Sequence, residues 1–151
     1  MKKPRTSEKV VSHSEAETIR IGTDFATRLR SGSVVALYGD LGSGKTRFIK
    51  GICAGLGVAT NVSSPTFNLV HEYRGASFRV YHFDFYRVHG VAEIADLGFE
   101  EYLDAGGVCL IEWADLAGRL LPAERFDVRM SAGAKTDERS IVIESHSPNL
   151  S

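Results

Sequence analysis

Apolar residues in the first part of the chain follow a helical spacing. From Ser14 they recur at approximately helical intervals as far as Leu29, and Glu17 completes a capping-box sequence with Ser14. This pattern predicts a helix that begins after Ser14. The pair Ile21-Gly22 could instead interrupt the helix, because glycine weakens a helix interior.

A short, continuously apolar run follows at 33–38, which is typical of a strand buried in a parallel sheet. Residues 39–44 form a glycine-rich loop, and the apolar side chains over 48–56 then fall on one helical face. Gly57 is placed to end this second helix as its C′ residue. The predicted local order is therefore strand, glycine loop, helix.

The rest of the chain is predicted to form strands around one broken helix. Aromatic and β-branched residues favour a hairpin with its turn at Arg74-Gly75-Ala76, and a later helical spacing breaks at Gly98. The predicted segments are strands at 67–73, 78–85, 108–111, 126–130 and 140–143, and a helical region at 91–103. Buried parallel-type strands beside helices, together with a hairpin, describe an α/β domain with a mixed sheet.

The composition is that of one globular domain. The 151 residues are 43% apolar and 25% charged, close to the averages for such domains. No apolar run approaches the roughly 20 residues that a membrane helix needs, and the charged N-terminus lacks the apolar core of a secretion signal. We therefore expect a cytoplasmic protein with no membrane segment.

Charge and cysteine content narrow the functional classes. Lysine and arginine number 18 against 19 acidic residues, a net charge of -1, which argues against autonomous nucleic-acid binding although a local patch stays possible. The two cysteines, Cys53 and Cys109, lie far apart in apolar segments. We interpret them as buried free thiols rather than a disulfide.

The glycine loop matches a known phosphate-binding pattern. GDLGSGKT at 39–46 fits G-x-x-x-x-G-K-[ST], whose glycines let backbone N–H groups surround phosphate oxygens. Lys45 would reach the β and γ phosphates, and the Thr46 hydroxyl would bind Mg²⁺ at the positive end of the helix dipole. The alternative is a simple glycine turn.

A phosphate loop with Mg²⁺ needs a further acidic group, and two strand ends offer one. Glu112 ends the apolar strand Val108-Cys-Leu-Ile, at the sheet edge where ligands collect; alternatively it is a solvated strand-end acid. Asp84 shares a strand face with His82 and could position the attacking water or complete the metal shell. Alternatively, Asp84 forms a structural pair with an arginine such as Arg87.

The segment after the second helix resembles a switch loop. Ser64, Pro65 and Thr66 stand where hydrolases of this class often sense the γ-phosphate, and Thr66 offers a hydroxyl to metal or phosphate. An ordinary turn explains this segment equally well.

Three nucleotide-dependent functions remain open from these residues. No asparagine is followed by lysine, so the N-K-x-D motif of GTPases is absent and ATP is the expected nucleotide. The alternatives to an ATPase are a small-metabolite kinase and a module that binds ATP without hydrolysing it. A kinase needs a second substrate pocket and a lid with several arginines. The candidates for such a lid are Arg119, Arg125 and Arg129, which do not point to one site. A module that only binds ATP would not need Asp84 and Glu112.

Five motifs in order then carry a family resemblance over nearly the whole chain. GDLGSGKT, SPTFNLVHEY, YHFDFYR, LGFEEYL and CLIEWAD are similar to those of the TsaE family. The resemblance implies a P-loop NTPase-like fold with a mixed, mainly parallel sheet flanked by helices. It also implies a Mg²⁺-dependent ATPase that drives or resets the TsaB–TsaD complex, which makes threonylcarbamoyladenosine in tRNA, so that tRNA is served only indirectly.

The resemblance further implies roles for individual residues. Asp84 would be the acid needed for hydrolysis, Glu112 and Thr46 metal ligands, Ser64 and Thr66 parts of the switch loop, and Trp113 a partner contact or a packing residue. The implied ATP-binding residues are Glu15, Thr18, Leu41, Gly42, Ser43, Gly44, Lys45, Thr46 and Arg139. Ala114 departs from the proline common after the family's E-W pair. We interpret residues 1–9 as a flexible leader and residues 10–151 as a single P-loop ATPase domain.

Overall fold

A computed structural model describes residues 6–65 and 68–146. Within these ranges the sheet has seven strands, in the order β1-β7-β6-β2-β5-β4-β3. The strands are β1 (Thr6–Ser12), β2 (Val34–Tyr38), β3 (Val70–Arg74), β4 (Arg79–Asp84), β5 (Val108–Glu112), β6 (Arg125–Ala132) and β7 (Arg139–His146). The helices are α1 (Glu15–Ala26), α2 (Lys45–Gly55), α3 (Val91–Asp96) and α4 (Phe99–Leu103), with short 3₁₀ turns at Ala114–Leu116 and Gly118–Leu120.

The sheet is mixed, and the two pairing modes occupy different parts of it. The central strands β6, β2, β5 and β4 are parallel neighbours, whereas β1–β7, β7–β6 and β4–β3 pair antiparallel at the two sides. The predicted α/β class with a mixed sheet is confirmed, and so is the hairpin, formed by β3 and β4. Parallel strands bring their carboxyl ends to one edge, and this edge carries the site described below.

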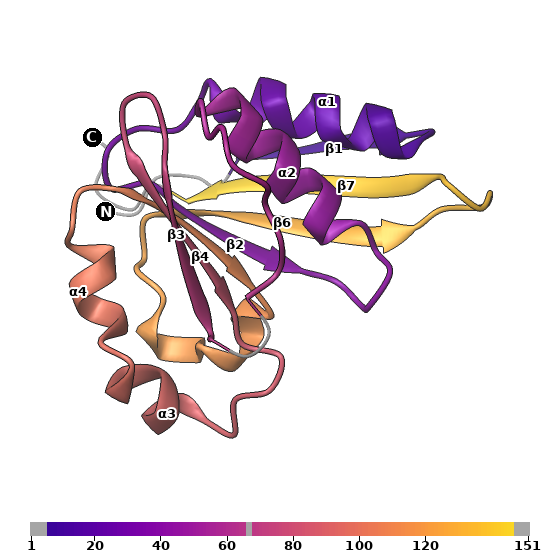
Figure 1. Ribbon diagram of the computed structural model, residues 1–151. Helices are drawn as coiled ribbons and strands as arrows, with labels where there is room; N and C mark the ends of the chain where they lie inside the picture. Colours follow the sequence, from indigo (N-terminus) through magenta and orange to yellow (C-terminus); the bar gives the residue numbers. More distant parts are fainter. Residues whose placement is uncertain (1–5, 66–67, 147–151) are drawn as a thin grey trace.

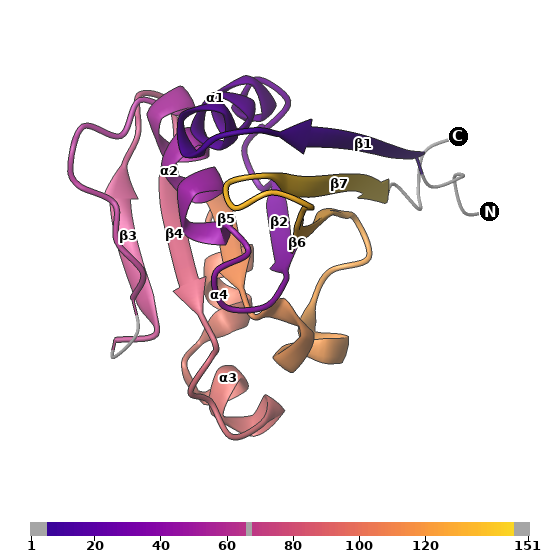
Figure 2. The same ribbon diagram turned by 90° about the vertical axis from the view of Figure 1, so that its right-hand side faces the viewer.

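Helices cover the sheet on both faces (Figures 1 and 2). α1 and α2 lie on one face, over a core that includes Phe48, Ile52 and Leu110. α3, α4 and the 3₁₀ turns cover the β2, β4 and β5 part of the other face, over a second core that includes Phe83 and Phe99. The β2, β4 and β5 strands are therefore buried from both sides, which explains their continuous apolar runs.

The first helix is continuous, so Gly22 does not interrupt it. The Ser14 side chain accepts a hydrogen bond from the Glu17 backbone N–H at 3.0 Å, which confirms the predicted N-cap. Gly22 is needed because α1 crosses α2 there: a Cβ on it would lie 2.3 Å from the carbonyl oxygen of Phe48. On α2, a Cβ on Gly51 would lie 2.0 Å from the carbonyl oxygen of Ile19.

The N-terminal segment departs from the sequence prediction. Residues 6–9 belong to the expected flexible leader, but they form part of β1, which pairs with β7 from Thr6↔Ser145 to Ser12↔Arg139. This strand is mostly exposed and polar, so hydrogen bonding to the edge of the sheet holds it rather than burial. Residues 1–5 of the expected leader lie outside the described residues.

Other sequence predictions match the structure closely. The helical region at 91–103 is two helices separated at Gly98, whose φ of 86° is the left-handed conformation that glycine tolerates best. Cys53 and Cys109 are both free and buried. Within the described ranges, no helix combines the length and apolar character that crossing a membrane requires.

Candidate functional site

The glycine loop joins the carboxyl end of β2 to the start of α2, as the pattern predicted. Gly42 and Gly44 have φ angles of 81° and 99°, the left-handed region that residues with a Cβ rarely adopt. Gly44 is the N-cap of α2, and no side chain among the described residues caps this helix end. Its first N–H groups and the positive end of its dipole are therefore available to an anion.

Lys45 is the first residue of α2 and is only 5% exposed. Its ammonium donates hydrogen bonds to the carbonyl oxygens of Gly39 and, at 3.1 Å, of Asp40, and lies 4.5 Å from the centre of the Trp113 ring. Burial lowers the pKa of Lys45 from its usual value, and the charges of Glu112 and Asp84 act in the opposite direction. The ammonium is thus fixed where the loop would hold phosphate.

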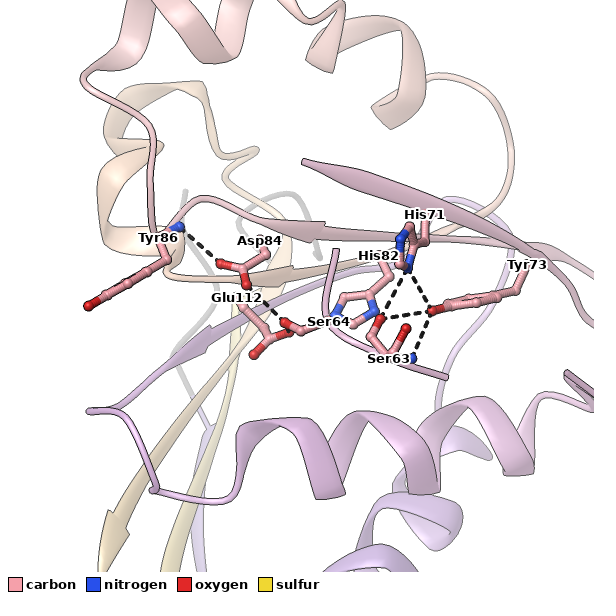
Figure 3. A network of polar contacts seen from close by, with 8 residues as sticks. All are labelled: Ser63, Ser64, His71, Tyr73, His82, Asp84, Tyr86 and Glu112. Atoms are coloured by element: carbon pink, nitrogen blue, oxygen red, sulfur yellow. Dashed lines mark hydrogen bonds and ion pairs between the residues drawn. The ribbon is translucent and has the colours of Figure 1, made fainter. Parts of the chain in front are cut away.

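The two predicted acids end adjacent parallel strands. Asp84 on β4 and Glu112 on β5 are register partners, with exposed fractions of 6% and 4%. Ser64 Oγ lies 2.8 Å from both Asp84 Oδ2 and Glu112 Oε2, between the two carboxylates (Figure 3). Asp84 Oδ1 also accepts a hydrogen bond from the backbone N–H of Tyr86 at 2.9 Å.

These contacts decide the reading left open for Glu112 and show what holds Asp84. Glu112 is not a solvated strand-end acid, because it is buried and hydrogen-bonded. Asp84 is hydrogen-bonded to Ser64 and to the chain just after β4, and Arg87 lines the same cavity as the acid. Ser64 does lie with the acids, as a switch segment would, whereas Thr66 lies outside the described residues.

His82 is a member of the site whose contact with Glu112 the sequence did not predict. Its side chain is fully buried, and its Nε2 lies 2.7 Å from Glu112 Oε2. Strand alternation placed His82 on the same face as Asp84, but only the register of β4 on β5 brings it to Glu112.

The Ser63-Ser64 segment is also held by the β3–β4 hairpin. The Tyr73 hydroxyl donates a hydrogen bond to the Ser63 carbonyl oxygen at 3.1 Å and accepts one from its N–H at 3.3 Å. His71 Nδ1 lies 3.1 Å from the same carbonyl oxygen. Figure 3 shows these rings on one side of the segment and the two carboxylates on the other.

One cavity of about 510 Å³ joins these parts at the carboxyl edge of the sheet. Every described residue that the sequence assigned to the site lines it. These residues are Glu15, Thr18, Leu41, Gly42, Ser43, Gly44, Lys45, Thr46, Ser64, Asp84, Glu112, Trp113 and Arg139. Arg47, Tyr86, Arg87 and Asp137 complete the lining and were not predicted from the sequence.

Three residues that the family resemblance assigned to the nucleotide lie on α1 and β7. Glu15 and Thr18 belong to α1, and Arg139 begins β7. Glu15 forms an ion pair with Arg47 of α2 at 3.1 Å; the Glu15 side chain is exposed and that of Arg47 is half-buried. Thr18 is buried, with its hydroxyl 2.6 Å from Ser12 Oγ. Arg139 passes beside the loop, since its Nε lies 3.6 Å from the position of a Cβ built on Gly44.

Trp113 forms part of the cavity wall. It follows Glu112 directly and has a φ of 56°, a conformation rare for a bulky residue and therefore a sign of local constraint. Its ring packs against that of Tyr86, with centroids 4.9 Å apart, and beneath the Lys45 ammonium. Trp113 thus packs against the site and is half-buried, and its role as a partner contact stays a prediction.

The donor set of this cavity suits a nucleotide with a hard metal ion. Backbone N–H groups, Lys45 and Arg139 offer positive charge to phosphate, while Thr46, Asp84 and Glu112 offer the oxygen ligands that Mg²⁺ prefers. The hydroxyl of Ser43 in the loop is buried and has no hydrogen-bond partner among the described residues. The residues present therefore fit a magnesium–nucleotide complex.

Comparisons with known proteins agree with this arrangement. Residues 12–141 match the family model described as "Threonylcarbamoyl adenosine biosynthesis protein TsaE". The chain is 44% identical to a tRNA threonylcarbamoyladenosine biosynthesis protein TsaE of Bacillus subtilis, over 83% of this chain and 77% of that protein. Identity is 38% to the protein of that name from Rickettsia conorii, over 91% and 78% of the two chains.

A solved structure supports the same fold. The crystal structure of Bacillus subtilis YdiB superposes with a TM-score of 0.82 at 33% sequence identity. The superposition covers 96% of this chain and 89% of that one. A P-loop-like α/β architecture is therefore shared over nearly the full length of both proteins.

Proposed function

The chain belongs to the TsaE family of tRNA threonylcarbamoyladenosine biosynthesis proteins, and from this premise we propose that it is a Mg²⁺-dependent ATPase that drives or resets the TsaB–TsaD complex. One observation carries the proposal. A phosphate loop, two buried carboxylates and the segment before Thr66 line a single cavity at the carboxyl edge of the sheet.

The loop residues bind and orient the triphosphate in this proposal. The N-terminal N–H groups of α2 and the Lys45 ammonium contact phosphate oxygens, and Lys45 exchanges its carbonyl partners on Gly39 and Asp40 for them. Thr46 and Glu112 would hold Mg²⁺, which neutralises charge on the phosphates when bound. Glu15, Thr18 and Arg139 border the same cavity and would contact the rest of the nucleotide.

Asp84 is proposed to act on the attacking water. Its carboxylate is fixed by the Tyr86 N–H and by Ser64, so it presents a carboxylate whose orientation is set before the substrate arrives. A carboxylate so held accepts a hydrogen bond from water and aligns it with the γ-phosphorus. Hydrolysis then breaks the bond between the γ-phosphorus and the bridging oxygen of ADP, and water supplies the new oxygen of phosphate.

The partners follow from the family assignment and not from the cavity. We propose that TsaD and TsaB form the complex on which the ATPase acts, and that tRNA is served through them, in the cytoplasm. A net charge of -1 supports an indirect role, because proteins that grip tRNA alone usually carry a basic excess.

The experiment measures ATP hydrolysis by the purified chain, with and without TsaB and TsaD. We expect hydrolysis that requires Mg²⁺ and rises with the complex, and its loss in Asp84→Asn. Asp96→Asn, at an exposed acid that ends α3, serves as the matched control and should behave as wild type. The proposal is wrong if the complex produces no increase and Asp84→Asn matches wild type. Transfer of labelled γ-phosphate to an organic acceptor instead of water would favour the kinase alternative.

A further inference from the structure

His82 is the most deeply buried polar residue of the site. Its side chain is 0% exposed, although a polar ring is costly to bury unless its nitrogens have partners. Nε2 has one, Glu112 Oε2 at 2.7 Å, and Nδ1 has none among the described residues. Among the described residues, the ring therefore has one hydrogen-bonding partner, the proposed metal ligand Glu112.

The hydrogen bonds of the two acids leave one oxygen open. Asp84 uses Oδ1 for the Tyr86 N–H and Oδ2 for Ser64. Glu112 uses Oε2 for both Ser64 and His82. Of these four carboxylate oxygens, Glu112 Oε1 is the one that makes no hydrogen-bond contact with the part of the chain described here.

Packing on the far side of the ring fixes its orientation. The Tyr73 ring centroid lies 6.2 Å from that of His82, and the His71 centroid lies 6.5 Å away, nearly perpendicular. Because a carboxylate oxygen accepts hydrogen bonds, His82 is the donor in this contact, through the N–H at Nε2. The imidazole is thus a rigid donor aimed at one oxygen of Glu112.

We propose that His82 is a positioning residue for Glu112: by holding Oε2, it sets the carboxylate so that Oε1 is left for Mg²⁺ or its bound water. The inference rests on the proposed function and extends it to a residue that does not line the cavity itself. The physical basis is general, because hydrogen bonds from outside the ligand shell orient metal-binding side chains.

The test separates metal binding from nucleotide binding and from folding. ADP affinity is measured by calorimetry in EDTA and over a Mg²⁺ series for wild type, His82→Phe and His82→Gln. Phenylalanine fills the buried slot without a donor, whereas glutamine places an amide N–H near the former Nε2. The control is Phe83→Leu, on the same strand but buried in the opposite core, so it weakens packing without touching Glu112.

In His82→Phe we expect Mg²⁺ to bind about 10- to 100-fold more weakly, the usual loss when a residue that hydrogen-bonds a metal ligand is removed. The Mg²⁺ concentration that half-saturates the effect on ADP affinity should rise by the same factor. ADP affinity in EDTA should stay unchanged, and His82→Gln and Phe83→Leu should keep a Mg²⁺ dependence near wild type. In a Glu112→Gln background, His82→Phe should cause no further change in the Mg²⁺ dependence of ADP affinity, because the carboxylate that His82 positions is already gone. If His82→Phe does not fold, His82→Met takes its place in the same comparison.

Three results would overturn the inference. They are a wild-type Mg²⁺ dependence in folded His82→Phe or His82→Met, an equal loss in Phe83→Leu, and an additive loss in the Glu112→Gln background. The proposed function fails in a different assay, in which TsaB and TsaD produce no increase in hydrolysis and Asp84→Asn matches wild type. A wild type that bound no ADP at any Mg²⁺ concentration would overturn both.

Discussion

Asp84 and Glu112 are register partners at the carboxyl ends of adjacent parallel strands, and one hydroxyl, Ser64 Oγ, lies 2.8 Å from an oxygen of each. A hydroxyl carries a single proton, so Ser64 donates to one carboxylate at a time. The loop that leads to Thr66 is therefore attached at one atom to both acids of the site. Any displacement of this loop must break contacts to both.

Ser64→Ala should slow hydrolysis without preventing nucleotide binding. The substitution removes the hydroxyl that holds both carboxylates, and we expect a loss of about 10-fold or more in kcat, as for other residues that orient ligands. ADP affinity in EDTA should not change. Ser63→Ala is the matched control, because Ser63 contacts Tyr73 through its backbone, which the substitution keeps. Equal kcat values for the two variants would contradict the role given to Ser64.

Lys45→Ala should weaken ATP binding. It removes a charge-assisted contact worth roughly 1.5–3 kcal/mol, or about 10- to 150-fold in dissociation constant. Lys50→Ala removes an exposed lysine from the same helix and should leave the affinity as in wild type. Calorimetry with a non-hydrolysable ATP analogue measures both variants. An unchanged affinity in Lys45→Ala would refute the placement of the ammonium at the phosphates.

Lys45 should also affect how stability depends on pH. Because burial lowers its pKa below the usual 10.5, the folded state binds the proton less tightly than the unfolded state. At pH values below the lowered pKa, Lys45 is charged in both states, and burying the charge lowers the free energy of unfolding by its full amount. This destabilisation disappears as pH rises toward 10.5. Lys45→Met removes this cost, so it should raise the free energy of unfolding near pH 7 by more than near pH 10.5. Urea unfolding of both proteins across this range measures the difference, and a pH-independent difference would contradict the prediction.

The parts of the site that are local in sequence were predictable. The loop at 39–46 and the acids at strand ends follow from short patterns whose chemistry is known, and the structure places Lys45, Asp84 and Glu112 on one cavity. The contact of His82 with Glu112 is different, because it depends on the register between strands 30 residues apart in sequence. No local pattern encodes that register.

The first strand shows a second limit of sequence patterns. β1 is largely polar and exposed, so it lacks the alternation by which a half-buried strand is recognised. Its position follows from the unpaired edge of β7, which forms only after residues 139–146 have joined the sheet. The prediction of a flexible leader over residues 1–9 was therefore wrong for residues 6–9, because pairing with a strand distant in sequence orders them.

Both cysteines should be inert in the folded protein. Burial raises the pKa of Cys53 and of Cys109 to about 12, so at pH 8 only about one thiol in ten thousand is ionised. An aromatic disulfide reagent should therefore titrate no thiol in native buffer and two per chain in guanidinium chloride. Rapid reaction of either thiol in native buffer would show that the core around it opens readily.

The crossing of α1 and α2 should tolerate no side chain at Gly51. Alanine there would gain about 1 kcal/mol of helix propensity, but its Cβ would lie 2.0 Å from the Ile19 carbonyl oxygen, a backbone atom that cannot rotate away. The helices would have to separate, and overpacking of this kind costs roughly 1–3 kcal/mol or more. Real Cβ atoms essentially never lie under 3.0 Å from such a neighbour, so we expect the steric cost to exceed the gain in helix propensity.

Gly51→Ala should therefore lower the free energy of unfolding by about 1–2 kcal/mol in urea, after the gain in propensity is subtracted. Gly90→Ala is the matched control, because the extended backbone at Gly90, with φ of 170°, suits any residue and a Cβ there would meet no described atom within 4 Å. The same displacement would move Glu15 and Thr18, which α1 brings to the cavity, so ADP affinity in folded Gly51→Ala should fall as well. An unfolding free energy equal to or above that of Gly90→Ala would mean that the two helices are not held this closely.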